Sequence, residues 1–107
     1  MEKSPVIREL SAMTEFAKEG IVSKTVVSED YGKVVFFCMA KGQTLSEHTA
    51  SRPASVHIIE GKGKFMLGND WFDVTRDTWI LMPPHTKHAV TAEEDMVFLL
   101  TLFTGGK

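Results

Sequence analysis

The sequence predicts an all-β fold, a sandwich or barrel built from short strands. At least eight short runs rich in apolar, β-branched and aromatic residues follow one another closely along the chain. Turn residues, mostly Gly, Pro, Asn and Asp, separate these runs. The chain has 107 residues, of which 43% are hydrophobic, enough for one compact core. Many short strands with little helix are typical of sandwiches and barrels.

The first twenty residues are expected to form an arm with one short helix or turn. Apolar residues recur there about every third position, and Gly20 closes the segment. Residues 21–104 are then expected to form the barrel, so that residues 1–107 make a single domain. The recurring apolar residues of the arm are Ile7, Leu10, Met13 and Phe16.

The predicted strands follow from residue 21 onward. Residues 68–70 (GND) give the clearest hairpin signal, because a tight turn there separates two strand-like runs. Residues 34–40 and 96–102 are apolar on both faces, which favours a closed, well-covered barrel over an open sheet. The predicted strands are residues 21–27, 33–40, 54–60, 64–67, 71–74, 79–82, 89–91 and 96–103.

Two turns, residues 42–48 (GQTLSEH) and 83–88 (PPHTKH), each deliver a histidine to the strand region. Together with Glu60-Gly61 and the hairpin between the motifs, they resemble the two signature motifs of the cupin family. The resemblance covers residues 42–90. It implies a double-stranded β-helix, a jelly-roll barrel, with a metal ion held between the two motifs.

The resemblance implies metal ligands at His48 and His88, but the two further ligand positions of the family carry Ala50 and Ala54. Alternate residues of a strand share a face, so residues 48, 50 and 54 are expected to point into the barrel. Two histidines are fewer than the three protein ligands of catalytic zinc and non-haem iron sites. The implied cofactor is one divalent ion of iron, manganese, nickel or zinc, and a barrel without metal is the alternative.

Three further side chains have two interpretations each. Arg52 shares the parity of His48 and could bind a carboxylate or phosphate at the pocket rim, or be an ordinary exposed loop residue. His57 has the opposite parity and is expected on the outer face unless a bulge near Pro53 turns it inward. Cys38 is expected to be a small buried hydrophobe rather than a nucleophile.

The composition limits which binding partners and which cellular compartment are expected. The formal net charge is −2 without a basic stripe, so no nucleic acid is expected as a partner. The longest apolar run, residues 96–103, is too short to cross a membrane, and no membrane association is expected. The N-terminus lacks the apolar core of a signal peptide, and there is a single cysteine. These features predict a cytoplasmic protein.

Two functions of different class remain open from the sequence, and whether the chain is an enzyme is open with them. The first is a small-molecule-binding barrel with a reduced two-histidine pocket, lined by Ala50 and Ala54, with Arg52 at its rim. The second is a metal-dependent cupin enzyme, a small oxygenase or isomerase, that uses His48 and His88 as ligands. A homodimer is expected in both cases, because residues 6–27 could extend the sheet of a neighbouring copy.

Overall fold

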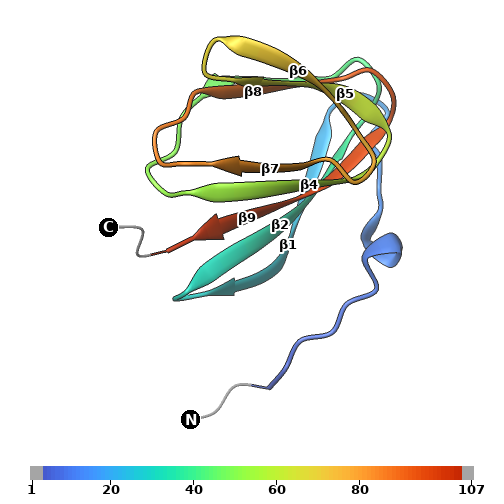
Figure 1. Cartoon of the computed structure of the whole chain (residues 1–107). Helices are drawn as coiled ribbons and strands as arrows, with labels where there is room; N and C mark the ends of the chain where they lie inside the picture. Colours follow the sequence, from blue (N-terminus) through green and yellow to red (C-terminus); the bar gives the residue numbers. More distant parts are fainter. Residues whose placement is uncertain (1–3, 105–107) are drawn as a thin grey trace.

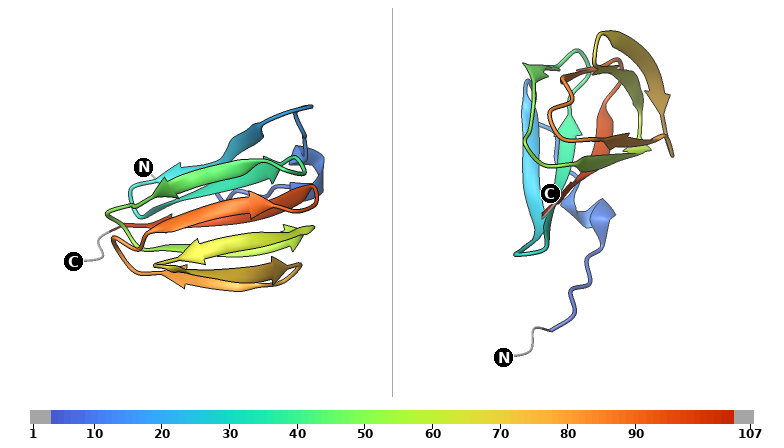
Figure 2. Two further views of the ribbon diagram at one scale, coloured as in Figure 1. Left: turned by 90° about the horizontal axis from the view of Figure 1, so that it is seen from above. Right: turned by 60° about the vertical axis from the view of Figure 1, so that its left-hand side comes forward.

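A computed structural model describes residues 4–104 and consists of two antiparallel sheets packed face to face (Figure 1). The larger sheet has the strand order β1-β2-β9-β4-β7, and the smaller has the order β3-β8-β5-β6. Figure 2 shows the strands of each layer lying side by side. The predicted all-β class is confirmed. The strands are β1 (Ile21–Glu29), β2 (Gly32–Met39), β3 (Thr44–His48), β4 (Ala54–Glu60), β5 (Lys62–Leu67), β6 (Asp70–Thr75), β7 (Trp79–Met82), β8 (His88–Ala92) and β9 (Met96–Phe103).

The main core lies between the two sheets. Phe98 of β9 is its centre: it stacks on Phe37 of β2 with ring centroids 5.0 Å apart, and it meets Phe65 of β5 edge-on at 5.6 Å. Offset and edge-on aromatic pairs add to the stabilisation from burial alone. Met39 and Ile58, fully buried, complete the same cluster. These contacts fix the spacing of the sheets around the barrel interior.

The predicted strands agree with the observed ones to within about two residues at each end, except that β3 was expected to be part of a turn. Gly42 does make the turn, with a φ of 87° and an N–H that donates to the Ala92 carbonyl at 2.8 Å. The chain then continues as a short strand that pairs with β8. Leu45 is the single apolar residue of β3, so the segment carries no alternating apolar pattern. Pairing with β8, rather than an alternating apolar pattern, therefore makes this segment a strand.

The turn between β4 and β5 requires a glycine. Gly61 has a φ of 81°, a region that other residues rarely adopt, and a Cβ at this position would overlap the Asp95 carbonyl oxygen. The strands on either side of it, β4 and β5, belong to different sheets, so this turn carries the chain from the large sheet to the small one. The predicted hairpin at residues 68–70 is also confirmed, since Leu67 of β5 pairs with Asp70 of β6.

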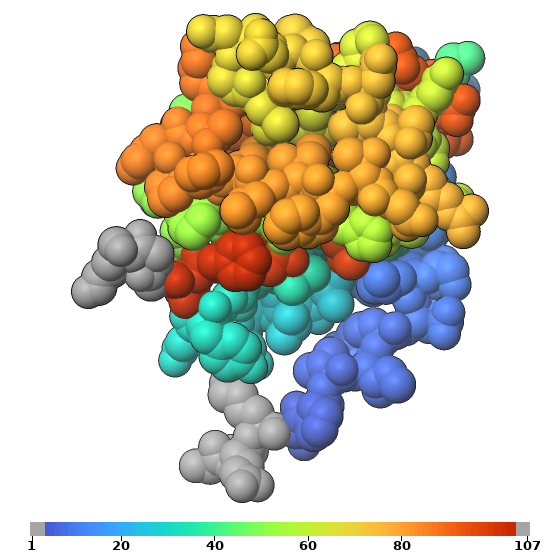
Figure 3. Space-filling model, viewed as in Figure 1, coloured from blue at the N-terminus to red at the C-terminus, as the bar shows by residue number. Residues whose placement is uncertain are grey.

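The N-terminal segment lies outside the barrel, against the five-stranded sheet (Figures 1 and 3). It contains one 3-10 helix, η1 (Leu10–Met13). A 3-10 helix repeats every three residues, which matches the apolar spacing of this segment and places Leu10 and Met13 on the sheet. Ile7 remains 91% exposed.

Residues 1–3 of the predicted arm and residues 105–107 lie outside the described part of the chain. Within residues 4–104, no helix is long and apolar enough to span a membrane.

Candidate functional site

His48 and His88 lie side by side at one end of the barrel. They are direct partners in the register of β3 and β8, and their ring centroids are 4.0 Å apart at an interplanar angle of 62°. His88 is partly buried, whereas His48 is exposed. The two motif histidines, forty residues apart in the sequence, therefore form one pair.

A β-bulge in β3 turns His48 toward the interior. Leu45 pairs with Val90, and His48 pairs with His88. Between these two pairs β3 advances by three residues, whereas β8 advances by only two. An extra residue in one strand shifts the side-chain alternation beyond it. Leu45 and His48, which have opposite parity, therefore line the same cavity. Bulges commonly re-aim a side chain in this way next to functional sites.

Both imidazoles are held in the same tautomer by the backbone carbonyl two residues earlier in the chain. Nδ1 of His48 lies 2.8 Å from the Ser46 carbonyl oxygen, and Nδ1 of His88 lies 2.9 Å from the Thr86 carbonyl oxygen. A carbonyl oxygen only accepts hydrogen bonds, so each Nδ1 carries the proton and donates it. In the neutral ring, Nε2 is then left with a free lone pair. The site thus offers two nitrogen acceptors from adjacent rings.

The environment of His88 favours its neutral form. Partial burial lowers the pKa of His88 below its usual value of 6.5, the hydrogen bond to the Thr86 carbonyl opposes this, and the neighbouring His48 lowers the pKa further. At neutral pH the His88 ring is therefore an acceptor and a potential metal ligand rather than a cation.

The cavity beside the two histidines is small and otherwise apolar. Excluding the open mouth, its volume is about 50 Å³, which is room for one or two water molecules. The walls come from both sheets, and the histidines are the only polar lining residues within the described chain. The apolar lining consists of Phe37, Leu45, Val56, Phe65, Met82, Val90, Phe98 and Leu100.

The other residues predicted for the pocket lie elsewhere. Ala50 and Arg52 are in the loop between β3 and β4, where the Ala50 carbonyl accepts the His85 N–H at 2.7 Å and Arg52 is exposed. Ala54 is buried in the core, opposite Met82 of β7 and Leu102 of β9. Because β3 ends at His48, the strand alternation does not extend to Ala50 and Arg52. Ala54 points into the core, as expected, and is not a lining residue itself, but it is the partner of Met82, which lines the cavity.

His57 lies on the outer face of the large sheet, as its parity predicts, with Nε2 3.4 Å from the Asp77 carboxylate. Glu47 is not among the lining residues of the cavity, and its carboxylate lies 3.9 Å from the Lys87 amine. Among residues 4–104, no group of three or more His, Cys, Asp or Glu side chains is arranged to hold a metal ion. The two histidines suit a metal as donors, but they supply one ligand fewer than the usual catalytic sets.

The comparisons with known proteins agree with this architecture. The family model described as "Cupin domain" matches residues 35–103, which include both histidines. This chain belongs to the cupin family. None of the curated proteins compared with the sequence matches it significantly.

Solved structures show the same cupin barrel in proteins of distant sequence. A cupin superfamily protein from Desulfitobacterium hafniense is 16% identical, with a TM-score of 0.85 and coverage of 98% of this chain and all of that one. A protein of unknown function from Streptococcus pyogenes is 24% identical, with a TM-score of 0.83 and coverage of 98% and 91%. A variant of salicylate 1,2-dioxygenase from Pseudoaminobacter salicylatoxidans is 11% identical, with a TM-score of 0.75 and coverage of 78% and 26%. At these identities the likeness concerns the fold.

The apolar lining of the site was not assigned from the sequence. No pattern in the sequence distinguishes Phe37, Phe65 and Phe98, which line the cavity, from the other aromatic residues. The bulge at β3 also has no sequence signature of its own here. Both features depend on the pairing of residues 44–48 with residues 88–92, which the sequence does not reveal.

Proposed function

We propose that this cupin binds a small, largely apolar molecule that carries a hydrogen-bond donor. The observation that supports this most directly is the pair of Nε2 acceptors, fixed by the two Nδ1 hydrogen bonds to Ser46 and Thr86. In the proposed complex the donor of the ligand contacts His48 or His88. The apolar part covers the opening of the cavity above Phe37 and Phe98.

The proposed class of ligand follows from the size and charge of the site. A pocket lined by apolar groups with a few polar ones typically binds through apolar contact and uses the polar groups for orientation. A cavity of about 50 Å³ admits only part of a ligand, so the remainder lies at the mouth beside exposed His48. A neutral ligand is favoured over an anion, because Arg52 is not among the lining residues and His88 tends to be neutral.

Cyclopentanol and cyclopentanone test this proposal, because they match in size but only the alcohol donates a hydrogen bond. In NMR titrations we expect cyclopentanol to shift the resonances of His48, His88 and the cavity phenylalanines with higher affinity than cyclopentanone. The double variant His48→Phe/His88→Phe, which removes both acceptors, should bind the two compounds equally. Equal affinity of the two compounds for the unmodified protein would contradict the proposal, as would shifts confined to residues outside the cavity.

A metal-dependent cupin enzyme, a small oxygenase or isomerase, is the second candidate. The free Nε2 atoms favour it, because the hydrogen bond from Nδ1 to a carbonyl is the usual support of a metal-binding histidine. The structural likeness to a dioxygenase is consistent with it but concerns the fold. In this proposal His48 and His88 hold one divalent ion of iron, manganese, nickel or zinc, and water or substrate supplies the remaining ligands.

Elemental analysis separates the two candidates. The protein is purified without chelator and without nickel affinity resin, and is also reconstituted with each of the four metals. Stoichiometric metal that disappears in the double variant His48→Ala/His88→Ala would establish the second candidate. If no metal is retained under any of these conditions, the second candidate is excluded. The double variant should keep its fold, because the exposed His48 and partly buried His88 lie at the barrel mouth.

We also propose that the protein is a cytoplasmic homodimer. The single cysteine, Cys38, is buried and unpaired, which fits a reducing compartment. Val6 and Ile7 expose apolar surface on a segment that extends from the barrel, and β1 forms an edge of the large sheet. Sedimentation equilibrium of the chain and of the variant Val6→Ser/Ile7→Ser tests the dimer. A monomer at all concentrations would contradict it.

A further inference from the structure

A second and larger cavity lies outside the barrel, between η1 and the outer face of the five-stranded sheet. Its volume is about 180 Å³, compared with about 50 Å³ for the histidine cavity. Phe36 of β2, Ile59 of β4 and Val97 of β9 supply its apolar side. Phe36 and Val97 belong to the small core cluster on this face and are almost fully buried. The cavity therefore has a rigid apolar floor.

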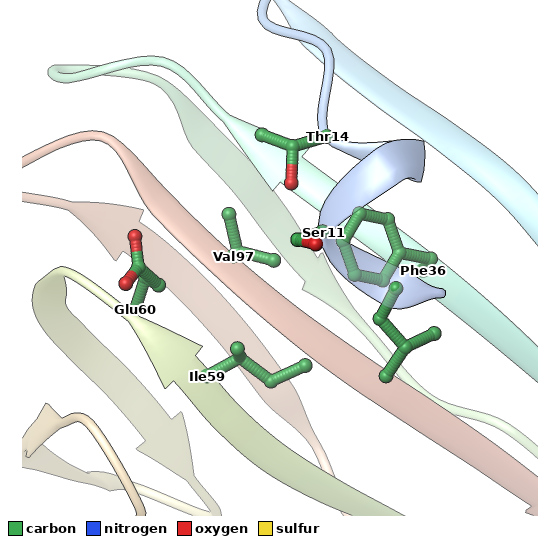
Figure 4. A pocket seen from close by; sticks show the side chains of 7 residues that line it. Ser11, Thr14, Phe36, Ile59, Glu60 and Val97 are labelled. Carbon is green, nitrogen blue, oxygen red and sulfur yellow. The ribbon is translucent and has the colours of Figure 1, made fainter. Parts of the chain in front are cut away.

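The rim of this cavity carries three oxygen-bearing side chains. Ser11 and Thr14 come from the N-terminal segment, and Glu60 ends β4. Figure 4 shows Val97 between Glu60 on one side and Ser11 and Thr14 on the other. A carboxylate and two hydroxyl groups, all of which can accept hydrogen bonds, thus lie around an apolar floor.

The charge at the rim is negative and has no partner among the described residues. The Glu60 carboxylate forms no hydrogen bond or ion pair with any residue of the described range 4–104. Ser11 has only a long hydrogen bond of 3.3 Å to Glu9. The free carboxylate and the hydroxyl groups are available to a ligand.

We propose that this cavity binds a small primary amine in its ammonium form. An ammonium group has three donors and no acceptor, which matches a carboxylate and two hydroxyl oxygens. An apolar cavity of about 150 Å³ takes benzene, so about 180 Å³ admits an apolar group of six to eight heavy atoms. The ring or chain of the amine lies on Phe36 and Val97, and its nitrogen lies at Glu60.

This site is independent of the histidine pair. Phe36 and Phe37 are adjacent in β2 and face opposite sides of the sheet, Phe36 toward the outer cavity and Phe37 toward the barrel. The large sheet therefore separates the two sites. Occupation of one site is expected to leave the resonances of the other unchanged.

Benzylamine, benzyl alcohol and benzoate test the proposal, because they share one ring and differ in charge. In ¹H–¹⁵N NMR titrations we expect benzylamine to shift the amides of Phe36, Glu60 and Val97 saturably and to bind about five-fold more tightly than benzyl alcohol, the contribution of a partly exposed ion pair. Benzoate should not bind. Glu60→Gln should lower the affinity for benzylamine about five-fold and leave that for benzyl alcohol unchanged.

Two further variants separate this effect from a loss of structure. Glu94→Gln removes an exposed carboxylate in the turn before β9 and should change none of the affinities. Ser11→Leu fills the cavity from the exposed segment and should abolish binding of both benzylamine and benzyl alcohol. The proposal is overturned if benzylamine gives no saturable shifts, if it shifts His48 and His88 instead, or if Glu60→Gln binds it as tightly as the unmodified protein.

Discussion

Replacing Ala54 with glutamate should raise the affinity of the His48–His88 site for a divalent ion. Ala54 is 3% exposed and sits opposite Met82, which lines the histidine cavity. An added carboxylate would join His48 and His88 in a set of two histidines and one carboxylate, which suits iron and related divalent ions. Without metal, the variant must bury the glutamate carboxylate with no cation to pair with it.

The expected magnitudes follow from the burial of Ala54. An uncompensated buried charge costs about 3–5 kcal/mol of the free energy of unfolding. For a chain of this size each kcal/mol corresponds to about 4–8 °C in Tm, so the metal-free variant should melt at least about 12 °C lower. A divalent ion at about a thousand times its Kd returns about 4 kcal/mol. Metal should therefore restore most of the lost stability.

Thermal unfolding of Ala54→Glu with and without manganese, nickel or zinc measures this effect. Ala54→Gln is the matched control, because it adds a side chain of the same size without the charge. The glutamate variant should gain far more stability from metal than the glutamine variant does. If both variants respond equally, residue 54 does not reach the two histidines, and the inferred geometry of the site is wrong.

Three further predictions concern the fold and the pH response. The pKa of His88 is lowered by folding, so the stabilisation linked to it is present above pH 6.5 and is lost as the pH falls. His88→Gln should therefore weaken the pH dependence of the free energy of unfolding, measured in urea between pH 7.5 and 5.5, and an unchanged dependence would contradict this. Phe98→Ala should cost about 3–5 kcal/mol in urea unfolding, because Phe98 is 2% exposed between two aromatic rings, and a loss below about 1 kcal/mol would mean that the rings repack. Gly61→Ala should destabilise the protein by more than 1 kcal/mol, since its Cβ meets the Asp95 carbonyl oxygen at a positive φ, while Gly42→Ala, where nothing lies within 4 Å, should cost less in the same assay.

Most of the barrel could be predicted from the sequence because its strands carry strong local signals. The runs of β4, β7 and β9 are bounded by glycine, proline and acidic turns, and their predicted limits match the structure. β3 has a single apolar residue and was expected to be a turn, since only its pairing with β8 makes it a strand. Local pattern therefore finds strands that bury a face and misses one that is largely exposed.

The candidate site could be predicted only in part. That His48 and His88 meet follows from the two motifs, and the structure pairs them. The positions of Ala50 and Arg52 could not be derived by counting along a strand, because the strand ends at His48 and a loop follows. The bulge that directs His48 inward depends on the register between β3 and β8. The outer cavity depends on how the N-terminal segment packs on the sheet, which no local pattern encodes.

The protonation of the two imidazoles tests the central claim most directly. Long-range ¹H–¹⁵N spectra of the histidine side chains at pH 7.5 distinguish the ring nitrogen that carries the proton. Both His48 and His88 should show protonated Nδ1 and free Nε2, as their hydrogen bonds to the Ser46 and Thr86 carbonyls require. Protonated Nε2 on either ring would remove the acceptor on which the proposed binding site depends.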